Sequence, residues 1–118
     1  MSDIEKWRKL DVWLKAHKLV VEVYRITEIF PNHELYCLVS QIRRAAISIV
    51  ANIVEGTKRQ TSKDRVHFYV MSDTSLEELK YYFILSYNLH YIDLQKASLL
   101  TEKARTVGRM LNGLIKCQ

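Results

Sequence analysis

Apolar side chains recur at alternating intervals of three and four residues along four segments of this chain. Because an α-helix has about 3.6 residues per turn, this interval gathers them on one face of a helix. The 118 residues include only one proline and three glycines, so few positions interrupt long helices. The third stripe also contains serines. The four stripes are Val12, Ala16, Leu19, Val23, Ile26 and Phe30; Leu35, Leu38, Ile42, Ala46, Ile49 and Ile53; Phe68, Ser72, Ser75, Leu79, Tyr82, Ser86 and Leu89; and Ala97, Leu100, Ala104, Val107, Leu111 and Leu114.

Residues with strong preferences at helix ends indicate where each helix begins or ends. Asp11 and Asp93 are suitable N-caps for the first and last helices, and Thr61 or Ser62 can cap the third. Gly56 suits the left-handed position that often follows a helix, so the second helix should stop there. The four expected helices span residues of about 11–30, 33–55, 63–91 and 94–116.

The connections between these helices are short. Short connections join neighbours that run in opposite directions, so the sequence predicts an all-α, antiparallel up-down-up-down four-helix bundle. The length suits one domain, residues 1–118. We find no run of about 18 apolar residues and no apolar region of a signal peptide at the start. We therefore expect no membrane association and a cytoplasmic location.

Polar residues lie within the segment 41–56, whose other residues belong in a core. Its apolar arc is wider than the roughly 100° that a surface helix needs, so this helix should contact more than one neighbour. The polar stripe is either a hydrogen-bonded ladder inside the fold or a site. Serines of the third helix are natural partners for a ladder, because buried polar groups need hydrogen bonds. The expected ladder comprises Gln41, Arg44, Ser48, Asn52, Glu55, Ser72 and Ser75.

An active site is the weaker interpretation of this stripe. Arg44 and Glu55 are eleven residues apart, which is about 16 Å along a helix axis, so they cannot act together on one small substrate. No second carboxylate or histidine is fixed near Glu55 by spacing, so we expect no catalytic residues and no enzyme. The Glu-x-x-His pattern of di-iron bundles is also absent, so we expect no metal and no cofactor. The histidines are His17, His33, His67 and His90.

Basic residues give the chain a net charge of +5 and gather in two groups. One group surrounds the connection between the second and third helices, and the other forms a ridge on the fourth helix. They form either a solvated face or a surface that contacts the phosphates of RNA or DNA. The sequence contains no base-reading motif, so such binding would have little sequence specificity. The candidate nucleic-acid-binding residues are Lys58, Arg59, Lys63, Arg65, Arg105, Arg109 and Lys116.

The first two helices carry more apolar side chains than their core stripes need. Exposed apolar patches of this kind usually mark protein interfaces, so we expect self-association. The candidate oligomer-interface residues are Trp7, Trp13, Ile47, Val50 and Val54.

A set of motif residues distributed over nearly the whole chain carries a family resemblance. These residues are Phe30, Pro31, Glu34, Tyr36, Leu38, Gln41, Arg44, Ala45, Ser48, Asn52, Ile53, Glu55, Gly56, Arg59, Phe68, Ser75, Leu76, Glu78 and Leu79. In them the chain resembles the small four-helix-bundle proteins encoded in intervening sequences of bacterial 23S ribosomal RNA genes. The accessory variability proteins of diversity-generating retroelements belong to the same broad family. The resemblance implies a bundle that assembles as a ring-like homo-pentamer and is not an enzyme. In the retroelement branch it implies a basic ring that binds nucleic acid and a reverse transcriptase.

These observations favour a non-enzymatic homo-oligomer, pentameric by resemblance, that binds RNA or DNA through phosphate contacts. A ring of five copies would multiply the charge of +5 fivefold and attract a polyanion strongly. The alternative is a protein-interaction or scaffold module that does not bind nucleic acid.

Overall fold

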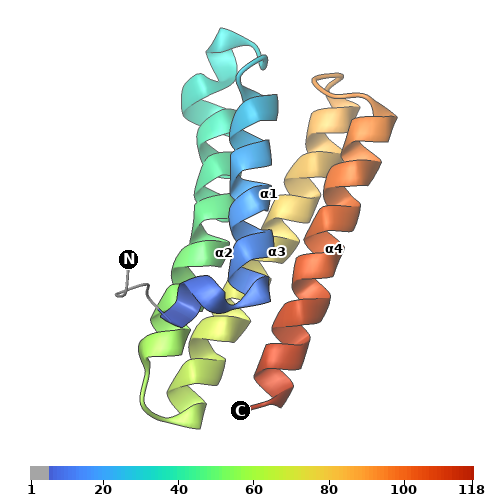
Figure 1. The fold of residues 1–118 in the computed structure, drawn as a ribbon. Helices are drawn as coiled ribbons and strands as arrows, with labels where there is room; N and C mark the ends of the chain where they lie inside the picture. Colours follow the sequence, from blue (N-terminus) through green and yellow to red (C-terminus); the bar gives the residue numbers. More distant parts are fainter. Residues whose placement is uncertain (1–5) are drawn as a thin grey trace.

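The computed structural model describes residues 6–118, apart from the side chains of Lys6 and Lys9. A short 3₁₀ turn, η1 (Lys6–Lys9), leads into four α-helices that run alternately up and down (Figure 1). The predicted all-α, up-down-up-down four-helix bundle is therefore confirmed. The helices are α1 (Asp11–Thr27), α2 (Ser40–Lys58), α3 (Ser62–Asn88) and α4 (Leu94–Lys116).

Each helix packs against two neighbours. Both α1 and α3 contact α2 and α4, and the contact between α2 and α3 is the most extensive. The core lies along the shared axis of the bundle. The predicted stripe of α1 is buried along its whole length, and that of α4 is buried from Ala97 to Leu111.

The stripe predicted for α2 is buried except at its first residue, Leu35, which is 45% exposed. Two short turns precede α2: a 3₁₀ turn, η2 (Asn32–Glu34), and a π-helical turn, η3 (Leu35–Val39). A π-helical turn holds more residues than an α-helical turn. The spacing that keeps Leu38 and Ile42 inside therefore leaves Leu35 outside.

The core face predicted for α3 was partly wrong. Tyr69, Leu76 and Phe83 are buried, and Phe83 is among the largest side chains that are fully enclosed. Phe68 is only half-buried and Leu89 is exposed, although the stripe included both. The reason is that two neighbouring faces of α3 carry apolar side chains, and the buried stripe lies beside the predicted one: Tyr69, Ser72, Leu76, Leu79, Phe83 and Ser86, also at intervals of three and four.

The ends of α1 differ from the prediction. The helix ends at Thr27, and the Phe30 amide donates a 3.2 Å hydrogen bond to the Thr27 carbonyl in a turn before Pro31. The expected cap at Asp11 was also wrong, because the extended N-cap residue is Leu10 and no side chain caps this end. Asp11 occupies the first turn, where a carboxylate interacts favourably with the helix dipole.

The side-chain caps of the two later helices are confirmed. The Thr61 hydroxyl accepts a 3.1 Å hydrogen bond from the amide of Asp64 at the start of α3. The Asp93 carboxylate accepts a 2.7 Å hydrogen bond from the Lys96 amide at the start of α4.

Gly56 does not end α2 in a left-handed conformation. The helix continues to Lys58, and no described glycine has a positive φ. A side chain at Gly56 would lie 2.5 Å from Cε1 of Tyr69, so glycine permits the close approach of that ring. Among the described residues, the positive φ belongs to His90 (66°), in the turn after α3. This turn ends α3 at Asn88, earlier than expected.

The segment Asn32–Lys58 is long and apolar enough, by length and composition alone, to cross a membrane. The sequence has no run of about 18 consecutive apolar residues, but the mean hydropathy of an 18-residue stretch within this segment is high enough. In the bundle Ile42, Ala46 and Ile49 of this segment are buried. Core helices of soluble proteins pass the same test, so the finding is weak support for a membrane span.

Candidate functional site

Four polar residues lie along the contact between α2 and α3 and form what we call the α2–α3 polar seam: Ser48, Asn52, Ser72 and Ser75. The hydroxyls of Ser48 and Ser75 lie 2.8 Å apart. The Asn52 amide nitrogen donates to the Ser48 carbonyl at 2.9 Å and to its hydroxyl at 3.1 Å. Ser72, which is fully buried, donates to the Ile49 carbonyl at 2.7 Å. These bonds satisfy polar groups that would otherwise destabilise a helix contact.

The other members of the predicted ladder lie outside this seam. Gln41 and Arg44 are exposed and make no hydrogen bond with it. Glu55 is also exposed and pairs with Arg59, one turn further along α2, at 2.6 Å. Arg44 and Glu55 therefore have separate surroundings and do not form one site. Within residues 6–118, no cluster of three His, Cys, Asp or Glu side chains is placed to hold a metal ion.

Sequence reasoning missed a contact that joins the end of α1 to α2. The Arg43 Nε donates a 2.9 Å hydrogen bond to the buried Thr27 hydroxyl. Its guanidinium carbon lies 4.4 Å from the centre of the Tyr24 ring, in a cation–π contact. Arg43 shares its face of α2 with Ile47, Val50 and Val54. An arginine among apolar residues on one face is itself the signal that a partner lies on the neighbouring helix.

A second missed contact joins the two connections at one end of the bundle. The Tyr91 hydroxyl donates a 2.8 Å hydrogen bond to the Glu34 carboxylate. The Tyr91 ring also packs against Phe30 with ring centres 5.1 Å apart. The hydrogen bond to Glu34, together with desolvation and the charge of the carboxylate, raises the pKa of Tyr91 above its ordinary value.

The basic residues around the α2–α3 connection have different surroundings. The Arg59 guanidinium pairs with Glu55 and lies 4.6 Å from the centre of the Phe68 ring. Arg65 donates from Nε to the Gln118 side chain at 2.6 Å and from Nη1 to the Gln60 carbonyl at 3.0 Å. Arg65 therefore holds the connection and the end of the chain together.

Three lysines gather at this end of the bundle. Lys58 and Lys63 are exposed and make no ion pair with a described residue. The Ser62 hydroxyl donates a 3.0 Å hydrogen bond to the Gln118 carbonyl, so the end of α4 lies beside the α2–α3 connection (Figure 1). Lys116, near the end of α4, is therefore at the same end as Lys58 and Lys63. We call these three residues the end lysines.

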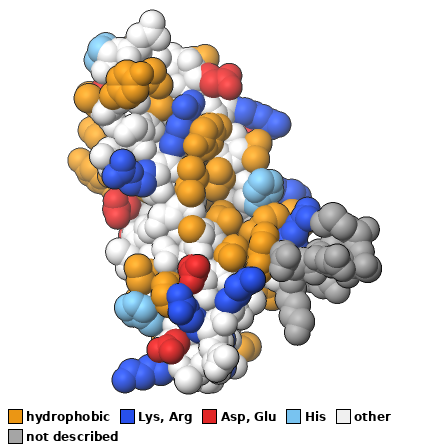
Figure 2. Space-filling model, turned by 90° about the vertical axis from the view of Figure 1, so that its left-hand side faces the viewer, with side chains coloured by type: hydrophobic (Ala, Val, Ile, Leu, Met, Phe, Trp, Pro, Cys, Tyr) orange, Lys and Arg blue, Asp and Glu red, His pale blue; other side chains and the backbone are white. Residues whose placement is uncertain are grey.

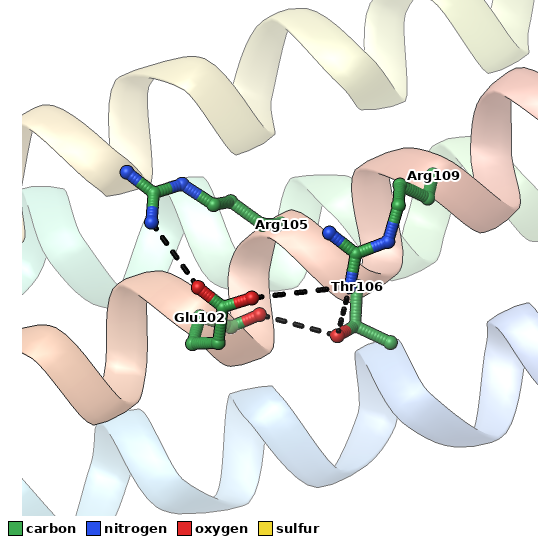
Figure 3. A network of polar contacts seen from close by, with 4 residues as sticks. All are labelled: Glu102, Arg105, Thr106 and Arg109. Atoms are coloured by element: carbon green, nitrogen blue, oxygen red, sulfur yellow. Dashed lines mark hydrogen bonds and ion pairs between the residues drawn. The ribbon is translucent and has the colours of Figure 1, made fainter.

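The arginine ridge of α4 is partly neutralised by its own helix. Figure 3 shows Arg105 and Arg109 turned toward Glu102, at 3.1 and 3.9 Å, while Arg109 also donates to the Thr106 hydroxyl at 3.1 Å. Acidic residues of α3 lie across the groove from this ridge. The groove has a volume of about 260 Å³ and is lined by Asp73, Glu77, Lys80, Arg105, Gly108, Arg109 and Asn112.

The candidate interface residues lie on the faces of η1, α1 and α2. Trp7 and Trp13 are half-buried with ring centres 5.2 Å apart, and Trp13 stacks on His17 at 5.0 Å. Beside this stack, a groove of about 210 Å³ between α1 and α2 is lined by His17, Val20, Ile47, Val50 and Ala51. Ile47 is 46% exposed, and Val54 is half-buried two turns further along α2. Figure 2 shows hydrophobic side chains gathered in a band along this side of the molecule.

Comparison with known proteins matches residues 8–113 to the family described as 23S rRNA-intervening sequence protein. Among solved structures, one similar chain comes from a protein of unknown function in the S23 ribosomal protein family of Bacteroides thetaiotaomicron. It has a TM-score of 0.82, covers 89% of this chain and 95% of its own, and is 22% identical. At this identity the likeness establishes a shared fold alone. No curated protein matches the chain.

Proposed function

The chain belongs to the 23S rRNA-intervening sequence protein family, and from this premise we propose that it is a non-enzymatic cytoplasmic homo-oligomer that binds RNA or DNA. The family assignment confirms the resemblance carried by the sequence motifs. The oligomer is proposed to be a pentamer, as that resemblance implies. The observation that carries the proposal is the gathering of the end lysines at one end of the bundle without described ion-pair partners.

Self-association is supported by the apolar band on α1 and α2. Ile47 is nearly half-exposed beside the α1–α2 groove, and this exposed apolar surface would be covered by another copy. Ile47→Asp places a charge in that interface, so it should convert an oligomer into a monomer. Leu99→Asp is the matched control, because Leu99 is similarly exposed (47%) but lies on α4. Light scattering at micromolar concentration measures both variants, and a monomeric wild-type protein would remove the inference.

Nucleic-acid binding is supported by the contrast between lysines and arginines in the candidate patch. Arg59, Arg105 and Arg109 have carboxylate partners within 4 Å, whereas the end lysines pair with no described carboxylate. The end lysines are therefore better placed to neutralise phosphates. Three such contacts per protomer would give a slope of about −2 for the logarithm of the binding constant against the logarithm of salt concentration.

Binding of a labelled single-stranded RNA at low and moderate salt tests this proposal. Changing Lys58, Lys63 and Lys116 together to glutamine should weaken binding strongly and flatten the salt dependence. Changing Arg105 and Arg109 to glutamine should have a smaller effect, because Glu102 already offsets their charge. Equal effects of the two variants would contradict the role given to the end lysines.

A protein-interaction scaffold is the second candidate, and the apolar band favours it. This function needs the same self-association but no attraction for phosphates. An oligomeric wild-type protein that fails to bind RNA at about 50 mM salt would support the scaffold, since electrostatic binding is strong at that concentration.

A further inference from the structure

A separate hollow lies between α1 and α4, away from the end lysines and from the apolar groove. It has a volume of about 230 Å³ and is lined by Lys15, Lys18, Leu19, Lys103 and Thr106. We call it the α1–α4 lysine pocket. Three of its five lining residues are lysines, and none is acidic.

The two helices supply the three ammonium groups from facing turns. Lys15 and Lys18 are three residues apart on α1 and therefore lie on one side of it. Lys103 comes from α4, which packs directly against α1. Leu19 is only 1% exposed and forms the apolar floor of the pocket, whereas the three lysines are exposed at its rim. An anion bound in the pocket would interact favourably with all three positive charges.

Two of the nearby carboxylates are engaged with other cations, whereas Asp11, one turn before Lys15, has no ion pair with a described residue. Glu22 of α1 pairs with Lys96 at 3.7 Å, and Glu102 of α4 pairs with Arg105 and Arg109. The three pocket lysines have no ion pair with any residue in the described part of the chain. Their combined charge is therefore available to a ligand.

The type and size of the pocket indicate the chemistry of that ligand. Lysine ammoniums act as compact point charges, so three of them around one hollow suit an anion with more than one negative charge, such as a phosphate compound. The volume lies below the roughly 300–1,000 Å³ of typical small-molecule sites, so one or two phosphoryl groups fit better than a whole cofactor. The Thr106 hydroxyl already donates to the Glu102 carbonyl at 3.2 Å, so the lysines supply the contacts.

We propose that the α1–α4 lysine pocket binds a phosphate-bearing anion through Lys15, Lys18 and Lys103. The anion is either a free phosphate compound or a phosphate group of a nucleic acid. The proposal goes beyond the nucleic-acid binding assigned to the end lysines and does not depend on it.

Isothermal titration of the intact protein with inorganic pyrophosphate at low salt tests the site. Changing Lys15, Lys18 and Lys103 together to glutamine should weaken binding at least about tenfold, since one hydrogen bond to a charged group is worth about that factor. The matched control changes Arg25, Arg44 and Lys80 to glutamine, which removes the same charge at other exposed or half-exposed positions and leaves the pair between Lys96 and Glu22 in place. The control should retain affinity within about twofold, because screened charges at a distance contribute little.

Equal loss in the two triple variants, or no pyrophosphate binding by the wild-type protein, would overturn the proposal. Acetylation of the wild-type lysines provides a measurement that needs no variant. Pyrophosphate should protect Lys15, Lys18 and Lys103 from the reagent and leave Lys80 unprotected. Protection of all lysines alike would also overturn the site.

Titration with a single-stranded oligonucleotide distinguishes the two sources of the anion. If the pocket variant binds the oligonucleotide more weakly and pyrophosphate competes with it, the source is the nucleic-acid backbone. If oligonucleotide binding is unchanged while pyrophosphate binding is lost, the source is a free phosphate compound. Both outcomes support the pocket. The variant that lacks the three end lysines should still bind pyrophosphate. A protein that binds pyrophosphate but no nucleic acid would therefore contradict the proposed function without contradicting the pocket.

Discussion

Replacement of Gly56 by alanine should destabilise the bundle, although alanine is the better helix former. The added Cβ would lie 2.5 Å from Cε1 and 2.8 Å from Cδ1 of Tyr69, well inside contact distance. The Tyr69 ring is 2% exposed, so it has little room to move aside. Overpacking of this kind costs about 1–3 kcal/mol, and a clash this close belongs at the upper end. Helix propensity returns at most about 1 kcal/mol, so we expect a net loss of about 2 kcal/mol.

Gly113→Ala is the matched control, because no atom lies within 4 Å of the Cβ it would add on α4. At this position the added Cβ meets no neighbour, so the change affects only helix propensity. The free energy of unfolding should therefore rise by about 0.5–1 kcal/mol. Thermal and urea unfolding at one fixed protein concentration measure both variants, since self-association makes the melting temperature depend on concentration. One kcal/mol corresponds to about 4 °C for a domain of this size.

The two glycine variants should therefore shift the melting temperature in opposite directions. A Gly56→Ala protein as stable as the wild type would refute the reasoning, because it would mean that the helix contact can open without loss. The double change Gly56→Ala with Tyr69→Leu tests the cause. If the ring creates the clash, the two losses should be less than additive.

Three further predictions concern hydrogen bonds. Ser72→Ala should lower the free energy of unfolding by about 1 kcal/mol, whereas Thr74→Ala, on the exposed side of α3, should change it by less than about 0.5 kcal/mol in urea unfolding. Asn52→Ala should lower the melting temperature, and unchanged melting and unchanged oligomer size would show that the α2–α3 polar seam contributes nothing. The pKa of Tyr91 is higher in the folded protein than in the unfolded chain, where it is about 10. The hydrogen bond to Glu34 therefore stabilises the fold at pH values below about 10, and this stabilisation is lost as the pH rises through the pKa of the folded protein. The difference in unfolding free energy between wild type and Tyr91→Phe should hold up to about pH 9 and shrink above pH 10, and a pH-independent difference would contradict this linkage.

The fold was largely predictable because most of its helices bury one face. In α1 and α4 the intervals of three and four identify the core, and the side-chain caps at Thr61 and Asp93 are local features. The prediction failed on α3, where two neighbouring stripes carry large apolar side chains and the spacing alone does not choose the one that contains Phe83. It also failed at Gly56, where the reason for glycine is a ring from another helix rather than the backbone conformation.

The candidate surfaces were less predictable, since long-range pairings determine which charges remain available. Arg65 binds Gln118, 53 positions away in the sequence, so its role as a structural residue depends on where α4 ends. Lys116 lies at the same end of the bundle as Lys58 and Lys63 only because α4 ends beside the α2–α3 connection. Lys15 and Lys103 lie on helices expected at opposite ends of the chain, so the α1–α4 lysine pocket carries no local sequence signal.

The α2–α3 polar seam has a consequence for the alignment of these two helices. A purely apolar contact tolerates sliding, because one leucine can replace another against the neighbouring surface. If α3 slipped by one turn, about 5.4 Å, Ser75 would leave the Ser48 hydroxyl and Ser72 would leave the Ile49 carbonyl. Because the two serines are three residues apart, one could take the other's place, but the second hydroxyl would lose its partner on α2. The serines thus specify a single register for the central helix pair, onto which α1 and α4 dock.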